Sequence, residues 1–271
     1  MATLETQGIT LYYETFGEPS NPPVMLLSGL GGTGASWSGQ TARLAKSYFV
    51  VVPDHRGTGR STHSQTGYST IQLAADMSSL VKDLDLGPTH IIGASTGGAI
   101  GQMMALNHPD TVKTLTLVSS FARFDSFMRR QFELRRKLVA ESGARGAREV
   151  YEAYSLFLFA PRFAREHPES VEAWIDRAAA QPVTPENRNI ALQRIDMIAA
   201  HDALLRLGEI RQSCLAVCGE LDFCTPLPLS EEIARAIPGC ELAVIPNGGH
   251  LVEREQEEAF FAIVSEFLGR H

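Results

Sequence analysis

The stretch Gly93-Ala94-Ser95-Thr96-Gly97-Gly98 decides the fold of this chain. It fits the pattern G-x-S-x-G, in which a serine sits on a sharp turn from a strand into a helix. Small residues must flank that serine, because a bulky neighbour would clash with the backbone of the turn. The apolar run at residues 89–92 predicts a buried strand before the turn, and the helical spacing over 99–106 predicts a helix after it. The sequence therefore predicts a nucleophilic serine at position 95.

Strand and helix patterns alternate on both sides of this turn. Patterns typical of strands occupy residues 11–16, 24–27, 49–52, 114–118, 214–218 and 241–245, and helical spacing occupies 37–46 and 71–84. This alternation predicts an α/β fold with a mainly parallel, eight-stranded sheet and helices on both faces. Residues 17–23 are rich in Gly, Pro, Ser and Asn, which predicts a turn and a hairpin at the sheet edge.

The segment 121–200 breaks this alternation, because only helical patterns fill it. A set of ordinary crossover helices is one interpretation, but the segment greatly exceeds the usual length of such a connection. We therefore expect residues 1–120 and 201–271 to form the core of the protein and residues 121–200 to form a helical cap.

Composition excludes several classes of function. A chain of 271 residues with 44% hydrophobic residues supplies a large core, and its net charge of −7 gives no basic field for nucleic acid or an anionic membrane. No apolar run approaches the roughly 20 residues of a membrane-spanning helix, so we expect a soluble, cytoplasmic protein. The four cysteines form no C-x-x-C pair, so we expect free thiols, no metal site and no cofactor.

A nucleophilic serine needs a histidine that accepts its proton and a carboxylate that orients this histidine. Among the eight histidines, His250 has a suitable setting, because it ends a glycine-containing stretch after the last predicted strand. The acid is expected between the cap and His250, and Asp222 follows the 214–218 strand there. Glu220 in the same loop is the competing candidate. We predict Ser95, Asp222 and His250 as the catalytic residues.

Acyl transfer at a serine also requires two backbone N–H donors for the oxyanion, one of them from the residue after the nucleophile. That residue is Thr96. The glycine-rich stretch 28–32 follows the second predicted strand, and Leu30 within it is our candidate for the second donor. Residues 54–61 also contain glycines, but they lack the spacing of a phosphate-binding loop, so we expect a structural loop there.

Together these motifs resemble those of the α/β-hydrolase fold superfamily over nearly the full length of the chain. The stretch 28–37 and the start of the cap are similar to aminoacrylate hydrolases of pyrimidine utilisation and, less closely, to 3-oxoadipate enol-lactonases. Ser28 is a departure, because many members carry histidine there. The resemblance implies a serine hydrolase that acts on a small ester, lactone or amide.

Residues 121–148 hint at a substrate that bears a carboxylate. Eight basic and three acidic residues give this segment a local positive excess in an acidic protein. Most of these charges are expected to lie on a solvated helical face, but Arg123 and Arg130 are our candidates for a carboxylate clamp. Trp37, near the glycine-rich stretch, is expected either to line the substrate site or to anchor its helix.

Three other functions are compatible with the same residues. They are hydrolysis of a carbon–carbon bond in a ring-fission product, a perhydrolase or haloperoxidase-type activity, and ligand binding on a hydrolase scaffold. In each case the expected partner is a small molecule, with no nucleic acid and no membrane. The sequence leaves open whether the chain forms a homodimer.

Overall fold

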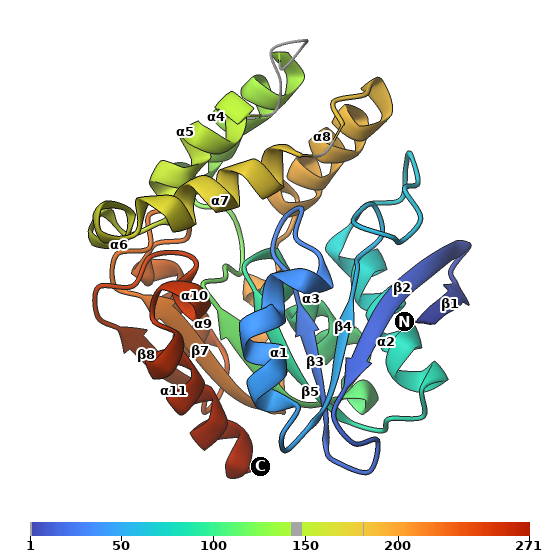
Figure 1. The fold of residues 1–271 in the computed structure, drawn as a ribbon. Coiled ribbons are helices and arrows are strands. Elements are labelled where there is room, and N and C mark those ends of the chain that lie inside the picture. Colours follow the sequence, from blue (N-terminus) through green and yellow to red (C-terminus); the bar gives the residue numbers. More distant parts are fainter. Residues whose placement is uncertain (1, 142–147, 181) are drawn as a thin grey trace.

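The computed structural model describes residues 2–141, 148–180 and 182–271. Within them, one sheet contains eight strands in the order β1-β2-β4-β3-β5-β6-β7-β8 (Figure 1). The strands are β1 (Ala2–Thr6), β2 (Ile9–Phe16), β3 (Pro23–Leu27), β4 (Phe49–Pro53), β5 (Thr89–Ala94), β6 (Val112–Val118), β7 (Ser213–Gly219) and β8 (Glu241–Ile245). Strands β3 to β8 pair in parallel, whereas β2 is antiparallel to β1 and β4. The predicted mainly parallel, eight-stranded sheet is confirmed.

The hairpin at the sheet edge lies earlier in the chain than predicted. Gln7 and Gly8 join β1 to β2, and their φ angles of 50° and 74° fit a type I′ turn. Residues 17–23 instead carry the chain from β2 to β3, which lie on opposite sides of β4. The strand β1 gave no clear signal in the sequence because most of its residues are exposed.

The helices divide into a core set and a cap set. The core helices are α1 (Ser38–Leu44), α2 (Thr70–Asp83), α3 (Thr96–Asn107), α9 (Leu227–Ala236), α10 (Val252–Glu255) and α11 (Glu257–Gly269). The cap helices are α4 (Ser126–Glu141), α5 (Arg148–Leu158), α6 (Pro161–Glu166), α7 (Pro168–Ala179) and α8 (Pro185–Ala199). Short 3-10 helices occupy Gly34–Trp37, Pro109–Thr111 and Leu204–Glu209.

Two apolar layers sandwich the sheet. Met25 and Leu27 of β3 face one layer, which includes side chains of α2, α3 and α9. Val24 and Leu26 face the other layer, which includes side chains of α1 and α11. Because successive strand residues point to opposite faces, a strand buried on both faces is a continuous apolar run. The predicted helices on both faces are therefore present.

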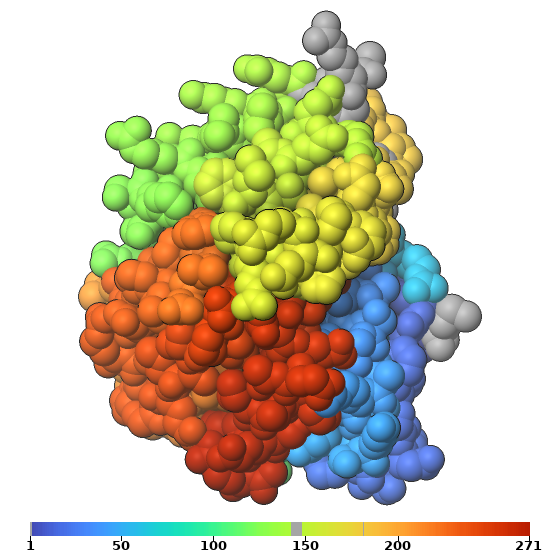
Figure 2. Space-filling view, turned by 60° about the vertical axis from the view of Figure 1, so that its left-hand side comes forward, coloured from blue at the N-terminus to red at the C-terminus, as the bar shows by residue number. Residues whose placement is uncertain are grey.

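The five helices α4–α8, which we call the cap, lie between β6 and β7 in the chain and contact the core both at the loop after β4 and at the loop after β8. Figure 2 shows the yellow segment of the cap, near residues 160–180, directly on the orange and red residues of the core. Backbone contacts fix this position, because the carbonyl oxygen of Leu158 accepts the N–H of His250 at 2.9 Å. The cap thus touches the loop that carries a predicted catalytic residue.

Two further findings concern the described part of the chain. It contains no helix long and apolar enough to cross a membrane. All four cysteines are free, and three of them are buried, whereas Cys240 is only partly buried.

Candidate active site

Ser95 lies at the junction of β5 and α3 in a strained backbone conformation. Its φ of 53° and ψ of −115° are rare for a residue with a side chain, and such strain concentrates at functional sites. The neighbouring glycines are required by close packing. A Cβ atom at Gly97 would lie 2.1 Å from the carbonyl oxygen of Leu27, and one at Gly93 would lie 2.3 Å from the carbonyl oxygen of Gly97. The strand-turn-helix context and the demand for small residues are both present.

Asp222 and His250 meet in the loops that follow β7 and β8. The Nδ1 atom of His250 lies 3.1 Å from Oδ1 and 3.0 Å from Oδ2 of Asp222. The carboxylate is held in place because Oδ1 accepts the N–H groups of Cys224 and Thr225, each at 2.8 Å. The hydroxyl of Thr225 contacts Oδ2 at 2.8 Å. The structure therefore fixes the acid and orients the imidazole through its Nδ1 atom.

The charge of Asp222 governs the protonation of His250. Burial alone would lower the pKa of His250, but the adjacent carboxylate of Asp222, together with Cys224, raises it well above its ordinary value. Both side chains are almost fully buried. The competing candidate, Glu220, is exposed and accepts the N–H of Asn247. Of the two acids, only Asp222 therefore faces the histidine.

The two predicted oxyanion donors lie on either side of the serine. Leu30 occupies a turn in which the N–H of Gly32 donates to the carbonyl oxygen of Gly29 at 3.1 Å. A Cβ atom at Gly29 would lie 3.4 Å from Cβ of Ser95, so this turn adjoins the serine. Thr96 begins α3, where N–H groups have no acceptor within the helix. Thr96 therefore follows the nucleophile directly in the chain, and the turn that contains Leu30 adjoins it.

Ser28 supports the same turn in place of the histidine found in many members of the superfamily. Its hydroxyl donates to the carbonyl oxygen of Thr33 at 2.7 Å and so ties the two ends of the glycine-rich stretch together. Asp54, in the loop after β4, accepts the N–H groups of Gly34 and Arg60, each at 2.9 Å. These contacts agree with the structural role predicted for residues 54–61.

The three residues predicted to bind substrate lie elsewhere. Trp37 is 2% exposed and packs near Phe260, with ring centroids 6.5 Å apart, so the structure favours the anchoring alternative. Arg123 is half exposed and pairs with Glu232 at 3.0 Å. Arg130 is exposed. None of the three lines the cavity described next, so a carboxylate clamp at Arg123 and Arg130 gains no support.

A cavity of about 170 Å³ lies between the cap and the loops that follow β3 and β4. Its wall includes Leu30 and three arginines of the cap, Arg135, Arg188 and Arg194. Arg135 belongs to the basic excess noted in the sequence, of which Arg145 lies outside the described residues. Arg188 and Arg194 were missed by the sequence analysis. The spacing of apolar residues in α8 could have indicated that Arg194 is buried. Arg194 lies one helical turn from Ile190 and one from Ile198, so all three share the buried face of the helix.

Metal ligands do not cluster in the part of the chain that the structure describes. Within those residues, no group of three or more His, Cys, Asp or Glu side chains is arranged to hold a metal ion. The polar groups in the loops after β7 and β8 are instead a carboxylate and a histidine in contact with each other, and Ser95 follows β5 of the same sheet, a set suited to proton transfer.

Comparison with known proteins identifies the family. Residues 22–252 match the α/β-hydrolase fold family, and the chain belongs to it. A candidate carbamate hydrolase, RutD from Azorhizobium caulinodans, is 33% identical over 96% of this chain and 95% of that protein. A malate-bound thermophilic esterase from Thermogutta terrifontis is 26% identical with a TM-score of 0.84, over 99% of this chain and 96% of that one.

An enol-lactonase from Burkholderia xenovorans LB400 shares the fold. Its TM-score is 0.89 at 23% identity, over 99% of this chain and 100% of that one. Together with the family match, these likenesses confirm the resemblance predicted from the sequence motifs. The chain is a hydrolase of the α/β-hydrolase family.

Proposed function

From this family membership we propose a cofactor-independent serine hydrolase that cleaves a small ester, lactone or amide bearing a carboxylate. One observation carries the proposal. The strained Ser95 follows β5, and the buried pair of Asp222 and His250 follows β7 and β8 of the same parallel sheet. Because carboxyl ends of parallel strands lie at one edge, a nucleophile and an oriented base are gathered there.

Acylation begins with attack by Oγ of Ser95 on the substrate carbonyl carbon. The proton of the hydroxyl passes to Nε2 of His250, whose other nitrogen faces Asp222. The imidazolium formed in this step is stabilised by the buried carboxylate. The bond from the carbonyl carbon to oxygen or nitrogen then breaks, and the leaving group takes the proton from His250. The acyl group remains on Ser95.

The negative charge of the tetrahedral intermediate needs donors that are fixed before the reaction. The N–H groups of Leu30 and Thr96 serve this purpose in the proposal, and the first turn of α3 adds the positive end of a helix dipole. Water, deprotonated by His250, then attacks the acyl carbon. The acid is released, and the proton returns to Ser95.

The relatives support hydrolysis at a carbonyl carbon bonded to oxygen or nitrogen. RutD from Azorhizobium caulinodans carries the name of a candidate carbamate hydrolase, and the Thermogutta terrifontis protein is an esterase. Carbon–carbon cleavage and ligand binding have no specific observation in their favour. A candidate non-heme bromoperoxidase from Mycobacterium tuberculosis is 25% identical with a TM-score of 0.85, but the chain is more similar to the carbamate hydrolase candidate, at 33% identity. We therefore propose the ester, lactone or amide hydrolase alone.

Turnover assays test this function. Purified protein is incubated with short p-nitrophenyl esters, small lactones and carboxylate-bearing amides, alongside Ser95→Ala. We expect the variant to lose at least about 10⁴-fold in kcat while its circular dichroism is unchanged, because the nucleophile alone is removed. Ser20→Ala, at an exposed serine, is the matched control and should retain full activity. Near-full hydrolysis by Ser95→Ala would refute the assignment.

A further inference from the structure

Arg194 is a buried cation that pairs with no carboxylate in the part of the chain that the structure describes. The residue is 2% exposed, and its Nη1 atom donates to the carbonyl oxygen of Arg56 at 2.7 Å. Its Nε and Nη2 atoms are shielded from water and have no acceptor among the described residues. Burial lowers the pKa of Arg194 to about 10, so the side chain still carries its charge at neutral pH. Buried charges are ordinarily paired with an opposite charge, and Arg194 has none within the described ranges.

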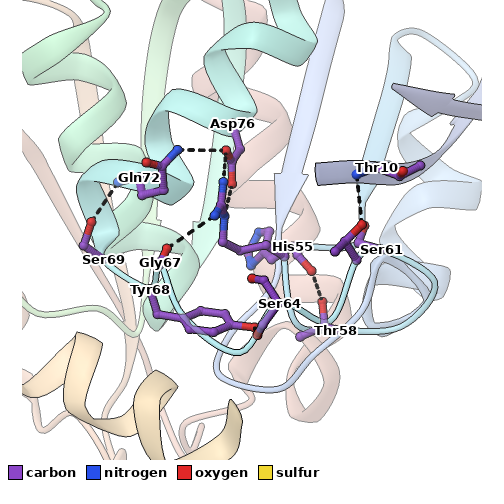
Figure 3. A network of polar contacts seen from close by, with 12 residues as sticks. Thr10, His55, Thr58, Ser61, Ser64, Gly67, Tyr68, Ser69, Gln72 and Asp76 are labelled. Carbon is purple, nitrogen blue, oxygen red and sulfur yellow. Dashed lines mark hydrogen bonds and ion pairs between the residues drawn. The ribbon is translucent and has the colours of Figure 1, made fainter. Parts of the chain in front are cut away.

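Neighbouring acids are already engaged with other groups. Asp76 of α2 is held by Arg56, whose Nε and Nη2 atoms donate to its two oxygens at 2.6 Å each (Figure 3). His55 carries no charge, because burial and the nearby Arg194 lower its pKa to about 3 and keep the ring neutral. The pair of Arg56 and Asp76 shows how the same edge of a guanidinium, Nε with Nη2, binds a carboxylate in this protein.

The cavity beside Arg194 is positively charged. Arg135 and Arg188 also line it, and no acidic side chain does so among the residues that the structure describes. The Nε atom of Arg188 is likewise buried without an acceptor. Arg135 lies over the ring of Tyr154, with its guanidinium carbon 3.9 Å from the ring centroid, so it is packed against an aromatic face. The unmatched donors of Arg194 therefore stand in a site that favours an anion.

The same cavity shares one residue with the proposed acyl-transfer site. Leu30, the proposed second oxyanion donor, forms part of its wall. Val150, Ile190 and Ile195 supply apolar parts of the wall. A ligand with a short aliphatic chain and one carboxylate matches this distribution of apolar and cationic groups.

We propose that Arg194 binds the carboxylate of the substrate through its Nε and Nη2 atoms. This inference rests on the proposed function, because it places the carboxylate in the same molecule that Ser95 attacks. The contact of Nη1 with Arg56 fixes the orientation of the guanidinium and leaves Nε and Nη2, which share one edge of it, for a carboxylate. The substrate class is thereby a small monocarboxylate whose reactive carbonyl is separated from the acid by a short aliphatic chain.

A pair of esters that differ in one charge tests the proposal. p-Nitrophenyl hemisuccinate carries the carboxylate, and p-nitrophenyl butyrate is its neutral analogue. Arg194→Met should raise KM for the hemisuccinate ester by roughly 10- to 100-fold, because charge-assisted hydrogen bonds are lost, and should change KM for the butyrate ester less than about threefold. Arg194→Lys should recover part of the loss, since it keeps the charge without the fork.

The control is Arg136→Met, which removes another arginine between α4 and α8. Arg136 is half exposed and pairs with Asp196 at 2.7 Å, so its loss should leave both KM values unchanged. Equal weakening of both esters by Arg194→Met would show that Arg194 only anchors the cap to the core and would overturn the proposal. An unchanged KM for the hemisuccinate ester would also overturn it.

Binding without turnover separates this inference from the proposed function. Calorimetric titration of Ser95→Ala with succinate should give binding that Arg194→Met, combined with Ser95→Ala, abolishes. Succinate binding that depends on Arg194, without any ester hydrolysis through Ser95, would support the anion site and refute the proposed function. If esters were hydrolysed but succinate binding were equal in both variants, the anion site would fail alone.

Discussion

Replacement of Asp222 by asparagine removes one charge and leaves the loop geometry in place. Oδ1 of Asp222 accepts two backbone N–H groups, from Cys224 and Thr225, and a carboxamide oxygen can keep both bonds. With the carboxamide oxygen in the place of Oδ1, the amide nitrogen lies where Oδ2 now lies, 3.0 Å from Nδ1 of His250. A donor then faces the Nδ1–H donor, so the imidazole must move its proton to Nε2. In that tautomer it cannot accept the proton of Ser95.

The expected loss follows from this geometry. The charge pair that stabilises the imidazolium is separated by about 3 Å in a buried site, which corresponds to roughly 5 kcal/mol at an effective dielectric constant of about 20. Each factor of ten in rate corresponds to about 1.4 kcal/mol, so Asp222→Asn should lower kcat by about 10³- to 10⁴-fold. The residual rate comes from the oxyanion donors.

The pH profile gives a second readout of the same change. Asp222 raises the pKa of His250 well above its ordinary value against the effect of burial. Activity needs neutral His250, so kcat/KM of the parent protein should rise with pH along a limb above pH 6.5, and the limb of Asp222→Asn should move to lower pH. Steady-state hydrolysis of p-nitrophenyl butyrate from pH 5 to 9 measures both. Glu220→Gln is the control and should match the parent protein, whereas Asp222→Asn activity within threefold of the parent would refute the reasoning.

Three other perturbations address the scaffold. Gly93→Ala places a Cβ atom 2.3 Å from a backbone oxygen and should lower the free energy of urea unfolding by about 3 kcal/mol. Gly269→Ala, whose Cβ would have no atom within 4 Å, is the control and should lower it by less than about 0.5 kcal/mol. Equal losses would contradict the packing argument. Arg56→Met leaves the buried carboxylate of Asp76 with the amide of Gln72 but without its cationic partner, and should cost about 3–5 kcal/mol. The double variant Arg56→Met/Asp76→Leu should restore part of this loss, and a mild single variant would argue against the pair. Burial raises the pKa of Glu255 from 4.5 to about 7, so the folded state binds more protons than the unfolded state in this window, and the free energy of unfolding falls as pH rises through it. Glu255→Gln should flatten that dependence in urea unfolding at pH 5 and 7.5, and an unaltered slope would exclude Glu255 as its source.

The features predicted from the sequence are those set by local chemistry. The turn around Ser95 requires small residues, because backbone atoms crowd Gly93 and Gly97. The requirement leaves a recognisable G-x-S-x-G pattern in the sequence. The continuous apolar strands predicted a sheet covered on both faces. Asp222 and His250 could be placed because loops after neighbouring parallel strands converge at one edge of the sheet.

The features that escaped prediction depend on tertiary packing. The clustered basic residues of 121–148 suggested a clamp, yet Arg123 and Arg130 lie at the surface, where charged side chains are usually solvated. Arg194 lies in a helix that contains both polar and apolar residues, and its burial results from packing of the cap against the loop that contains Arg56. Trp37 gave no decisive signal either, because an aromatic residue near a substrate loop is equally suited to the core.

Detection of the acyl-enzyme tests the central claim, which is that Ser95 attacks the substrate carbonyl. The protein is mixed with excess p-nitrophenyl butyrate, quenched in acid within the first turnover, and analysed by intact mass and peptide mapping, with Ser95→Ala in parallel. The account predicts one butyryl group per chain, carried by the peptide that contains Ser95 and lost in the variant. A butyryl group on another residue, or turnover that persists in Ser95→Ala, would contradict it.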